Sequence, residues 1–517
     1  MSDLTLSTIP EWFAGKKLFI TGGTGFVGKI IIEKLLRSCP DIDTIYILIR
    51  TKKGVNPKQR FEDFTNQVVF SKLKEKNPDC FQRLKLIKGD VTEEDLGICS
   101  EDHQELVQNV EIVIHCAATV RFVLPLKESA EFNVLGTWRM LELAKEMKKL
   151  VSFVHVSTAF CQEIGQILEE RGYPTEHDPT NVIEMTKVLD ANCMEMLKPR
   201  LMRKNYCNTY TYTKALAEVL CSKYQDVLPI AIARPSVIII AKKEPFVGYT
   251  EYTYGPNGMA IAGSHGILRT LYCKGDLPTC YIPVDTVANA TIAIAWDRGI
   301  KTQSHILPYY NIVESETCIT WDGALNVGNV DVFVNPYSKM MWYPFGGNEG
   351  NYYKFKILFF LLHYIPGFFI DMIMILMRRK PVFTKLYKKI EKGMMEYSHF
   401  LTKRWSFEND NLRALYKRLS ESDKETFDFD IWNMDWEAYI RNYNQGLRRF
   451  VVKDPLENIP KARKLLKKLY ILDRVTRAVL VGLVLWFFWN YASAFIRVLT
   501  FGLDSTRNVF TSFKKIT

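Results

Sequence analysis

The sequence lacks the patterns that mark several classes of protein. Its 11 cysteines are scattered between Cys39 and Cys318 with no Cys-x-x-Cys pair, which excludes zinc-finger spacing and an evident disulfide framework. Residues 1–17 carry Asp3 and Glu11 and no apolar run, so we expect no secretory signal there and reduced thiols throughout. Internal repeats and low-complexity tracts are also missing. We expect a folded intracellular protein without a metal site.

The positive charge is not accompanied by any nucleic-acid motif. Lys and Arg total 68 against 57 Asp and Glu, and much of the excess of +11 falls in the last third, for example at 378–380 and 461–468. A basic surface binds nucleic acid, anionic lipid or phosphorylated ligands. We therefore expect membrane lipid and a phosphate-bearing ligand as partners, and no nucleic acid.

Short apolar runs alternate with helical patterns from residue 16 onward. The runs that predict strands are Lys17–Ile20, Thr44–Ile49, Arg83–Lys88, Val110–His115, Val151–Val156 and Pro229–Ala233. Nearly unbroken Val, Ile and Leu, with helices between, indicate a parallel sheet covered on both faces. The predicted fold class is α/β, a Rossmann-type doubly wound domain over residues 14–340. Within it, residues 245–289 lose this periodicity and are predicted to form loops of a substrate pocket.

The remaining chain predicts a smaller helical domain and an anchor. Residues 351–455 are rich in aromatic residues, Met and Lys and have helical spacing. Ala478–Ile496 contains no charged residue, and its 19 residues make a helix roughly 28 Å long, the thickness of a bilayer core. We expect a transmembrane helix there, the alternative being a buried core helix. A second stretch, Ile357–Met377, fits a kinked buried helix or an interfacial hairpin better than a span, because it is interrupted by His363, Pro366 and Asp371.

A glycine-rich segment follows the first predicted strand and opens a helix. It comprises Thr21, Gly22, Gly23, Thr24, Gly25, Phe26, Val27 and Gly28. In such a segment Gly22 permits the tight turn, Gly25 lets the backbone approach a pyrophosphate, and Gly28 allows close packing of helix on sheet. Free amides at the helix start then bind phosphate. The strand–loop–helix context predicts a dinucleotide-binding site.

The end of the second strand indicates which dinucleotide binds. An acidic residue there would favour NAD, but this chain has Arg50, followed by Lys52 and Lys53. The Arg50 guanidinium is suited to a ribose 2′-phosphate, so we expect NADPH, the alternative being a solvated basic loop. Asp90, after the third strand, is expected to bind the adenine amino group or to cap a turn.

Two further segments predict proton-transfer chemistry. Tyr210 and Lys214 are four residues apart on a predicted helix and share a face. A nearby ammonium would lower the Tyr210 pKa and let this residue donate a proton to an oxyanion. Ser157 and Thr158 end the fifth strand and place hydroxyls at the same sheet edge. Alone, Tyr-x-x-x-Lys is as easily a surface pair; the order of the three features favours a site. From the residues alone we predict an NADPH-dependent carbonyl reductase or epimerase on a membrane.

With these motifs the chain resembles the extended short-chain dehydrogenase/reductases, and within them the alcohol-forming fatty acyl-CoA reductases of animals, insects in particular. The segments that carry the resemblance are the glycine loop, His115–Ala118, Asn133–Thr137, Val156–Cys161, Asn208–Ala215, Arg234–Ser236, Ile282–Asp285 and His363–Asp371. The resemblance covers residues 14–455. The predicted C-terminal anchor is also of the kind that the family has. Phe160 departs from the family pattern, in which Tyr is common.

The resemblance implies a four-electron reduction of long-chain acyl-CoA, through the aldehyde, to a fatty alcohol for wax, hydrocarbon or ether-lipid synthesis. It uses two NADPH. Tyr210 would be the general acid, Lys214 would bind the nicotinamide ribose, Thr158 or Ser157 would bond the carbonyl oxygen, and Ala117 would contact the cofactor. The open alternatives are a hydroxysteroid dehydrogenase/isomerase, which needs no separate helical domain, and a non-catalytic NADPH-binding scaffold.

The charges around the predicted anchor indicate its topology. Seven basic residues precede it from Lys461 to Arg477, and four follow it from Arg497 to Lys515, which keeps the catalytic part in the cytosol. The Lys514–Lys515 ending resembles an endoplasmic reticulum retrieval signal that is read in the cytosol, which conflicts with a single span. We expect one span, with the lysine ending either coincidental or reached by a short hairpin, and the endoplasmic reticulum rather than the peroxisome.

Overall fold

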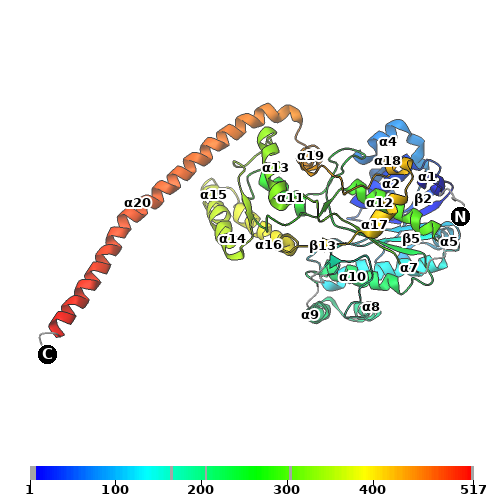
Figure 1. The fold of residues 1–517 in the computed structure, drawn as a ribbon, viewed down its shortest axis with the longest axis horizontal. Coiled ribbons are helices and arrows are strands. Elements are labelled where there is room, and N and C mark those ends of the chain that lie inside the picture. The colour runs from blue at the N-terminus through cyan, green and yellow to red at the C-terminus, as the bar shows by residue number, and fades with distance from the viewer. Residues whose placement is uncertain (1–6, 163–166, 204–205, 302–305, 514–517) are drawn as a thin grey trace.

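The computed structural model describes residues 7–162, 167–203, 206–301 and 306–513, with side chains described as far as residue 492. A sheet of seven parallel strands, in the order β11-β7-β5-β4-β1-β2-β3, lies at the centre of the N-terminal half (Figure 1). The strands are β1 (Lys17–Thr21), β2 (Thr44–Ile49), β3 (Leu84–Lys88), β4 (Ile112–His115), β5 (Ser152–Val156), β7 (Ile230–Pro235) and β11 (Tyr309–Ile312).

The predicted Rossmann-type α/β fold is confirmed. The six predicted strands are present, and β11 is an edge strand that the sequence did not indicate. In register, Thr21 lies opposite His115, and Val156 lies opposite Ala233. The strand order reverses between β1 and β4, so the loops after these strands diverge and leave a crevice at the carboxyl edge of the sheet, where ligands of this fold bind.

Helices cover both faces of the sheet. The first face packs against α2 (Phe26–Ser38), α12 (Val284–Ile300) and α17 (Asp410–Arg418), and the second against α5 (Ser100–Asn109), α7 (Gly136–Glu146) and α10 (Thr209–Ser222). Alternation along β1 matches these layers, because Leu18 and Ile20 face the first and Phe19 the second. The other helices of this half are α1 (Ile9–Phe13), α3 (Pro57–Thr65), α4 (Ser71–Lys76), α6 (Leu126–Ala130), α8 (Pro179–Val188) and α9 (Ala191–Leu201).

The second half of the chain is mainly helical and shares its cores with the first. α11 (Gly255–Ser264) packs with this half although it comes earlier in the chain. The other helices are α13 (Trp321–Val334), α14 (Tyr352–Phe359), α15 (Ile365–Leu376), α16 (Phe383–Thr402), α18 (Glu421–Thr426), α19 (Trp436–Gly446) and α20 (Ile459–Phe513). Leu412 and Phe427 enter the core of the sheet domain. Conversely, α11 and α13 pack against α16 and α19. The expected units 14–340 and 351–455 are therefore interlocked.

Three short parallel strand pairs connect distant segments. They are β8 (Val237–Ile238) with β10 (Tyr281–Ile282), β9 (Thr270–Tyr272) with β12 (Gly347–Glu349), and β6 (Ile167–Leu168) with β13 (Ser406–Phe407). The last pair joins the loop after β5 to the segment after α16, which brings the end of α16 over the carboxyl edge of the sheet.

The stretch Tyr352–Leu376, made of α14, a π-helical turn and α15, is the one helix among the searched, described residues that is long and apolar enough to cross a membrane. One side of it is fixed to the protein. The His363 Nε2 accepts a hydrogen bond from the Arg269 amide at 2.9 Å, and the Asp371 carboxylate accepts the amides of residues 382–384. The other side exposes large apolar residues: Ile357, Phe360, Leu361, Phe368, Phe369, Met372, Ile373, Ile375 and Leu376. One side of this stretch is therefore buried, as expected for a buried helix, and the other side is exposed; its predicted place at a membrane interface stays a prediction.

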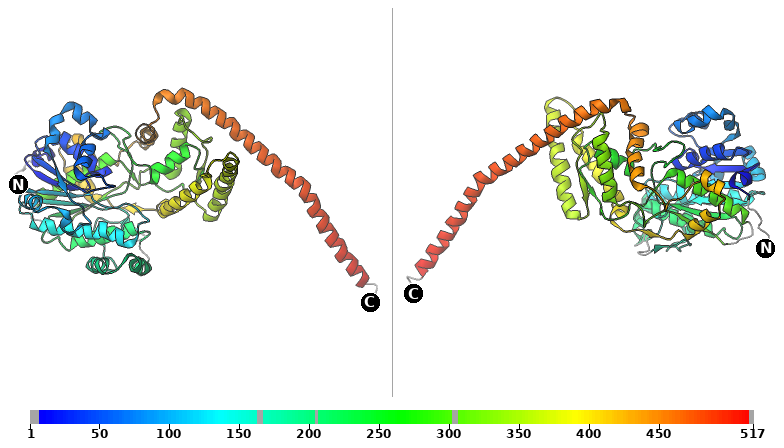
Figure 2. Two further views of the ribbon diagram at one scale, coloured as in Figure 1. Left: turned by 180° about the vertical axis from the view of Figure 1, so that it is seen from behind. Right: turned by 45° about the horizontal axis from the view of Figure 1, so that its top comes forward.

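The predicted anchor lies in α20, an unbroken helix of 55 residues that projects from the body (Figures 1 and 2). Its first part is held by the protein, since Leu469 is buried and Trp342 Nε1 donates to Asp473 Oδ1 at 3.0 Å. From Val479 to Tyr491 every large apolar side chain is exposed, including Trp489 at 84%. A buried core helix is therefore excluded for the described part of 478–496. The side chains of 493–496 and the Lys514–Lys515 ending lie outside the described residues.

Candidate active site

The glycine loop closes tightly over the end of β1. Gly22 has a φ of 69°, and a Cβ atom there would lie 2.6 Å from the Ala117 nitrogen. A Cβ atom on Gly28 would lie 2.5 Å from the Gly22 carbonyl oxygen. Helix α2 begins at Phe26, and no side chain caps it at Gly25. Only glycine fits at positions 22 and 28, and the open helix start leaves its amides for an anionic ligand.

A hydrogen-bonded chain joins this loop to the loop after β4. Thr21 Oγ1 lies 2.7 Å from His115 Nδ1, and His115 Nε2 lies 3.2 Å from Thr137 Oγ1. The Ala117 amide donates to Thr21 Oγ1 at 3.4 Å. Burial lowers the His115 pKa to about 3, so this imidazole is neutral and holds both loops by hydrogen bonds alone. The two loops that flank the crevice are thereby fixed relative to each other.

Cations gather at the end of β2. Arg50 is 39% exposed and lies over the Phe132 ring, while its NH1 donates to Asp90 Oδ2 at 3.1 Å. Arg60, from α3, bonds the Arg50 carbonyl oxygen and reaches Thr24 Oγ1 at 3.4 Å. Besides burial, neighbouring cations at positions 50, 53, 60 and 121 lower the Lys52 pKa. A bound anion, such as a 2′-phosphate, would relieve the repulsion between these cations.

Asp90 has two roles in this cluster. Besides pairing with Arg50, its Oδ1 accepts the Thr92 amide at 3.1 Å and so caps a turn. Sequence reasoning missed Arg60 and Arg121, which reach the cluster from α3 and from the loop after β4. A local pattern could have indicated Arg60. Asn56 and Pro57 mark the start of a helix, where Asn56 accepts the Gln59 amide, and Arg60 lies in the first turn of that helix, from which it reaches Arg50.

The residues predicted for proton transfer project from α10 and from the end of β5. Asn208 caps α10 by accepting the Thr211 amide at 2.9 Å. Tyr210, Lys214 and Glu218 then follow at four-residue intervals on one face. Glu218 accepts a bidentate ion pair from Arg234 of β7, at 2.9 and 2.7 Å, with both side chains buried. This ion pair fixes α10 against the sheet.

Tyr210 and Lys214 do not interact in the predicted way. The Lys214 Nζ donates to the Val156 carbonyl oxygen at 2.7 Å and lies 3.1 Å from His155 Nε2. Burial raises the Tyr210 pKa, and a hydrogen bond with Thr158 only partly offsets this. The prediction that Lys214 lowers the Tyr210 pKa was wrong here, because four-residue spacing does not determine where a long side chain ends. Tyr210 is instead a neutral phenol paired with Thr158, which suits a proton donor.

Lys214 is a buried cation whose hydrogen-bonding neighbours, the Val156 carbonyl and the His155 imidazole, are neutral. Burial lowers its pKa to about 8, opposed most by Glu218. Burial and Lys214 together lower the His155 pKa well below its ordinary value, and burial raises the pKa of Cys116 to about 12. Both neighbours stay uncharged near neutral pH. The Ser157 hydroxyl, next to Thr158 in the chain, is buried and has no protein partner among the described residues.

An aromatic group separates Tyr210 from the helical half of the chain. The Phe122 ring centroid lies 5.7 Å from that of Tyr210, 5.0 Å from that of Tyr397 and 5.5 Å from that of Phe400. Phe160, the departure from the family pattern, is buried edge-on against Phe400 at 5.1 Å. Its apolar surroundings leave no need for a phenol hydroxyl. Phe122 and Tyr397 were not singled out from the sequence because 275 positions separate them.

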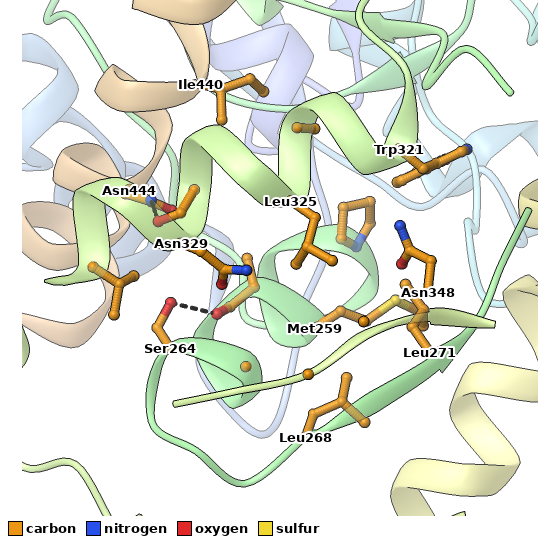
Figure 3. A pocket seen from close by; sticks show the side chains of 18 of the residues that line it. Met259, Ser264, Leu268, Leu271, Trp321, Leu325, Asn329, Asn348, Ile440 and Asn444 are labelled. Atoms are coloured by element: carbon orange, nitrogen blue, oxygen red, sulfur yellow. Dashed lines mark hydrogen bonds between the residues drawn. The ribbon is translucent and has the colours of Figure 1, made fainter. Parts of the chain in front are cut away.

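An apolar pocket lies beyond Tyr397, between α11 and α13 (Figure 3). Its other walls come from α16, α19 and the β9–β12 pair. Its apolar lining includes Met259, Leu268, Leu271, Leu325 and Ile440, with a few amide side chains among them. A largely apolar pocket with few polar groups is the usual form of a site for an apolar ligand.

The fold and this site define a class: a reductase of the short-chain dehydrogenase type that uses a nicotinamide cofactor. Two family models, each described as male sterility protein and the first an NAD-binding one, match residues 20–291 and 362–454. Fatty acyl-CoA reductase 1 of Xenopus laevis is 35% identical over 478 residues, 92% of each chain, and fatty acyl-CoA reductase wat of Drosophila melanogaster is 37% identical over 491 residues, 95% of this chain and 94% of that one. The chain belongs to the fatty acyl-CoA reductase family and is an oxidoreductase.

Solved structures share the fold. The terminal R domain of the myxalamid PKS-NRPS pathway has a TM-score of 0.59 at 17% identity, covering 86% of this chain and 93% of that one. The reductase domain of a nonribosomal peptide synthetase from Mycobacterium tuberculosis has a TM-score of 0.55 at 18% identity, covering 86% and 94%. Family membership sets aside the hydroxysteroid dehydrogenase and scaffold alternatives.

The Lys214 environment predicts an alkaline limit to the reductase rate. Lys214 carries its charge below its pKa of about 8 and loses it above, whereas His155 and Tyr210 have pKa values shifted out of this range. We expect kcat/KM to fall as pH rises through about 8. In Lys214→Arg the guanidinium keeps its charge, so any residual activity should lose this limb. An unchanged limb in that variant would assign it to another group.

Proposed function

We propose that this chain reduces long-chain fatty acyl-CoA to the primary alcohol, in two reductions through the aldehyde, with NADPH as the hydride donor in each. The observation that carries the proposal is the Tyr210–Thr158 pair, which lies at the carboxyl edge of the sheet with the glycine loop on one side and an aromatic wall leading to an apolar pocket on the other. Membership of the fatty acyl-CoA reductase family supports the substrate class.

The residues at the sheet edge fit the cofactor. The glycine loop and the start of α2 would hold the pyrophosphate through backbone amides. Arg50, Lys52 and Arg60 would bind the 2′-phosphate. Arg50 would then exchange its ion pair with Asp90 for one with the phosphate. Lys214 would hydrogen-bond the nicotinamide ribose, as in the family pattern. When bound, NADPH supplies the hydride.

The protein residues handle the oxygen of the substrate and its proton. Thr158 and Tyr210 would donate hydrogen bonds to the thioester carbonyl oxygen, which stabilises the negative charge that develops there. The Lys214 ammonium, buried near this point, adds positive charge in a medium of low dielectric constant. Collapse of the resulting tetrahedral oxyanion breaks the carbon–sulfur bond and gives the aldehyde, and the CoA thiolate that leaves takes a proton from solvent. In the second reduction the same phenol, with its raised pKa, gives up its proton to form the alcohol.

Replacement of Tyr210 tests the assignment of the general acid. Tyr210→Phe removes only the hydroxyl, so we expect kcat to fall by roughly 100-fold or more while NADPH affinity stays within twofold. Tyr212→Phe is a matched control, because Tyr212 lies on the same helix and its buried hydroxyl has no protein partner among the described residues. Alcohol formation and NADPH binding are measured for both variants. Unchanged turnover in Tyr210→Phe would refute the assignment.

Replacement of Arg50 tests cofactor choice. If its guanidinium binds the 2′-phosphate, Arg50→Ala should weaken NADPH binding by about 1.5–3 kcal/mol, a factor of roughly 10 to 150. NADH lacks the phosphate, so its affinity should barely change. Arg60→Ala should act in the same direction. Equal loss for both dinucleotides would show that Arg50 supports the fold instead.

We place the chain on the endoplasmic reticulum with its catalytic part in the cytosol. The membrane location is supported by the exposed apolar length of α20 and the exposed apolar side of α14–α15, and the cytosolic side by the basic residues before the span. We propose that residues 478–496 cross the bilayer once. Helices α14 and α15 would lie on its surface, because crossing would remove the partners of His363 and Asp371.

Protease protection on intact microsomes, with a tag at each end of the chain, tests this topology. We expect the N-terminal tag to be cleaved and the C-terminal tag to be protected. A protected N-terminal tag would refute the cytosolic placement, and a cleaved C-terminal tag would refute the single span. Co-localisation with endoplasmic reticulum or peroxisomal markers decides between the two organelles.

A further inference from the structure

The walls of the apolar pocket contain two facing rows of small residues. Ala260 and Gly263 lie on α11, and Ala324 and Gly328 lie on α13. Members of each row are three or four positions apart and so share a helix face. Because these side chains are small or absent, the two helices leave space between them, and the pocket occupies it (Figure 3).

Neither glycine is needed for the backbone. Both lie inside helices without a positive φ. A Cβ atom at Gly263 would meet no atom within 4 Å, and one at Gly328 would meet only Asn444 Nδ2, at 3.6 Å. Glycine inside a helix costs about 1 kcal/mol relative to alanine. What the two glycines provide in this structure is pocket volume.

One end of the pocket is close to the reacting groups. Tyr397 lines the pocket, and its hydroxyl would lie 3.2 Å from a Cβ atom on Gly255, at the start of α11. The same ring contacts Phe122, which contacts Tyr210. An apolar chain attached to a carbonyl carbon at Tyr210 would therefore pass Phe122 and then Tyr397 before it reached the pocket.

The pocket continues away from this end. Along α13 it extends from Trp321, which packs against Tyr281, to Val332, which packs near Leu469 of α20. The eleven residue steps from Trp321 to Val332, at ~1.5 Å each, make this wall roughly 16 Å long. Gly263, near the end of α11, and Gly328, past the middle of the stretch of α13 that lines the pocket, lie in the half remote from Tyr397.

Two polar side chains in that remote half, those of Ser264 and Asn444, are already bonded to the protein. Ser264 Oγ donates to the Ala260 carbonyl oxygen at 2.7 Å, and Asn444 Nδ2 donates to the Gly328 carbonyl oxygen at 3.0 Å. An apolar chain end can lie beside them without leaving a buried donor unpaired.

We propose that this pocket holds the acyl chain of the substrate, with its methyl end between Gly263 and Gly328, and that these two glycines set the longest chain the enzyme accepts. The inference rests on the proposed function, since it assigns the tail of the same substrate whose carbonyl carbon lies at Tyr210. It makes Gly263 and Gly328 specificity-determining residues that take no part in the chemistry.

Pocket-filling variants of the full-length protein test this assignment. In Gly263→Phe and Gly328→Leu the new side chain occupies the remote half of the pocket. Each methylene displaced from burial should lower kcat/KM roughly fourfold. We expect palmitoyl-CoA and stearoyl-CoA to lose at least tenfold relative to octanoyl-CoA, whose turnover stays close to that of the parent protein.

A matched control is Gly393→Phe on α16. Gly393 is also helical, a Cβ atom there meets nothing within 4 Å, and it does not line the pocket. We expect the parental chain-length profile from it. NADPH affinity, measured for all three variants, should stay unchanged, which shows that each variant is folded. The two pocket substitutions are independent, so the test stands if only one of the two variants folds.

The outcomes separate the pocket assignment from the proposed function. A selective loss of long chains supports the assignment. A parental profile in a folded pocket variant, or an equal loss at all chain lengths, overturns it while reduction of acyl-CoA by the parent protein stands. No turnover of any acyl-CoA by the parent protein, with NADPH bound, overturns both.

Discussion

The buried ion pair between Glu218 and Arg234 is the interaction on which the arrangement of the site depends. Glu218 stands on the same face of α10 as Tyr210 and Lys214, so fixing it against β7 fixes the direction in which all three residues point. Arg234 also donates to the carbonyl oxygens of residues 169 and 171, in the loop that leads from β6. A charge pair taken out of water is stable only with such complete hydrogen bonding. One guanidinium thus aligns the helix, the sheet and the loop that reaches the helical half of the chain.

That loop shows why the two halves form one enzyme. β6 pairs with β13, which directly follows α16, and α16 supplies Tyr397 and Phe400 to the aromatic wall at Tyr210. Segments after residue 410 then return to cover the sheet. The pocket and the sheet edge therefore meet because the chain crosses between them more than once. The helical region is part of the folding unit of the nucleotide-binding sheet, which a division of the sequence at residue 340 does not show.

The parts of the fold that sequence predicted are those set by local pattern. Strand runs such as Thr44–Ile49 and the spacing of Gly22, Gly25 and Gly28 encode the sheet and the phosphate loop directly, because neighbouring residues determine both. β11 was missed because Tyr309–Ile312 is short and carries Asn311. Arg60, Phe122 and Tyr397 reach the site only through tertiary structure. The direction of the Tyr210 pKa was predicted wrongly for a related reason: helical spacing gives the face of a side chain, whereas the end of a lysine goes to the nearest buried acceptor, here the Val156 carbonyl oxygen.

The continuity of α20 has a mechanical consequence. Its first turns are fixed to the body by the contact of Arg463 with the Val334 carbonyl oxygen, the bond between Asp473 and Trp342, and Arg477 over the Phe345 ring. From there the helix runs on without a break or a proline, so it has no hinge at which the catalytic body could swing. The catalytic body and α20 therefore turn together. The membrane that holds the far part of α20 would then set the direction in which the substrate pocket faces. Phe345 both lines the pocket and contacts Arg477. Bending of α20 would therefore displace the pocket wall at Phe345.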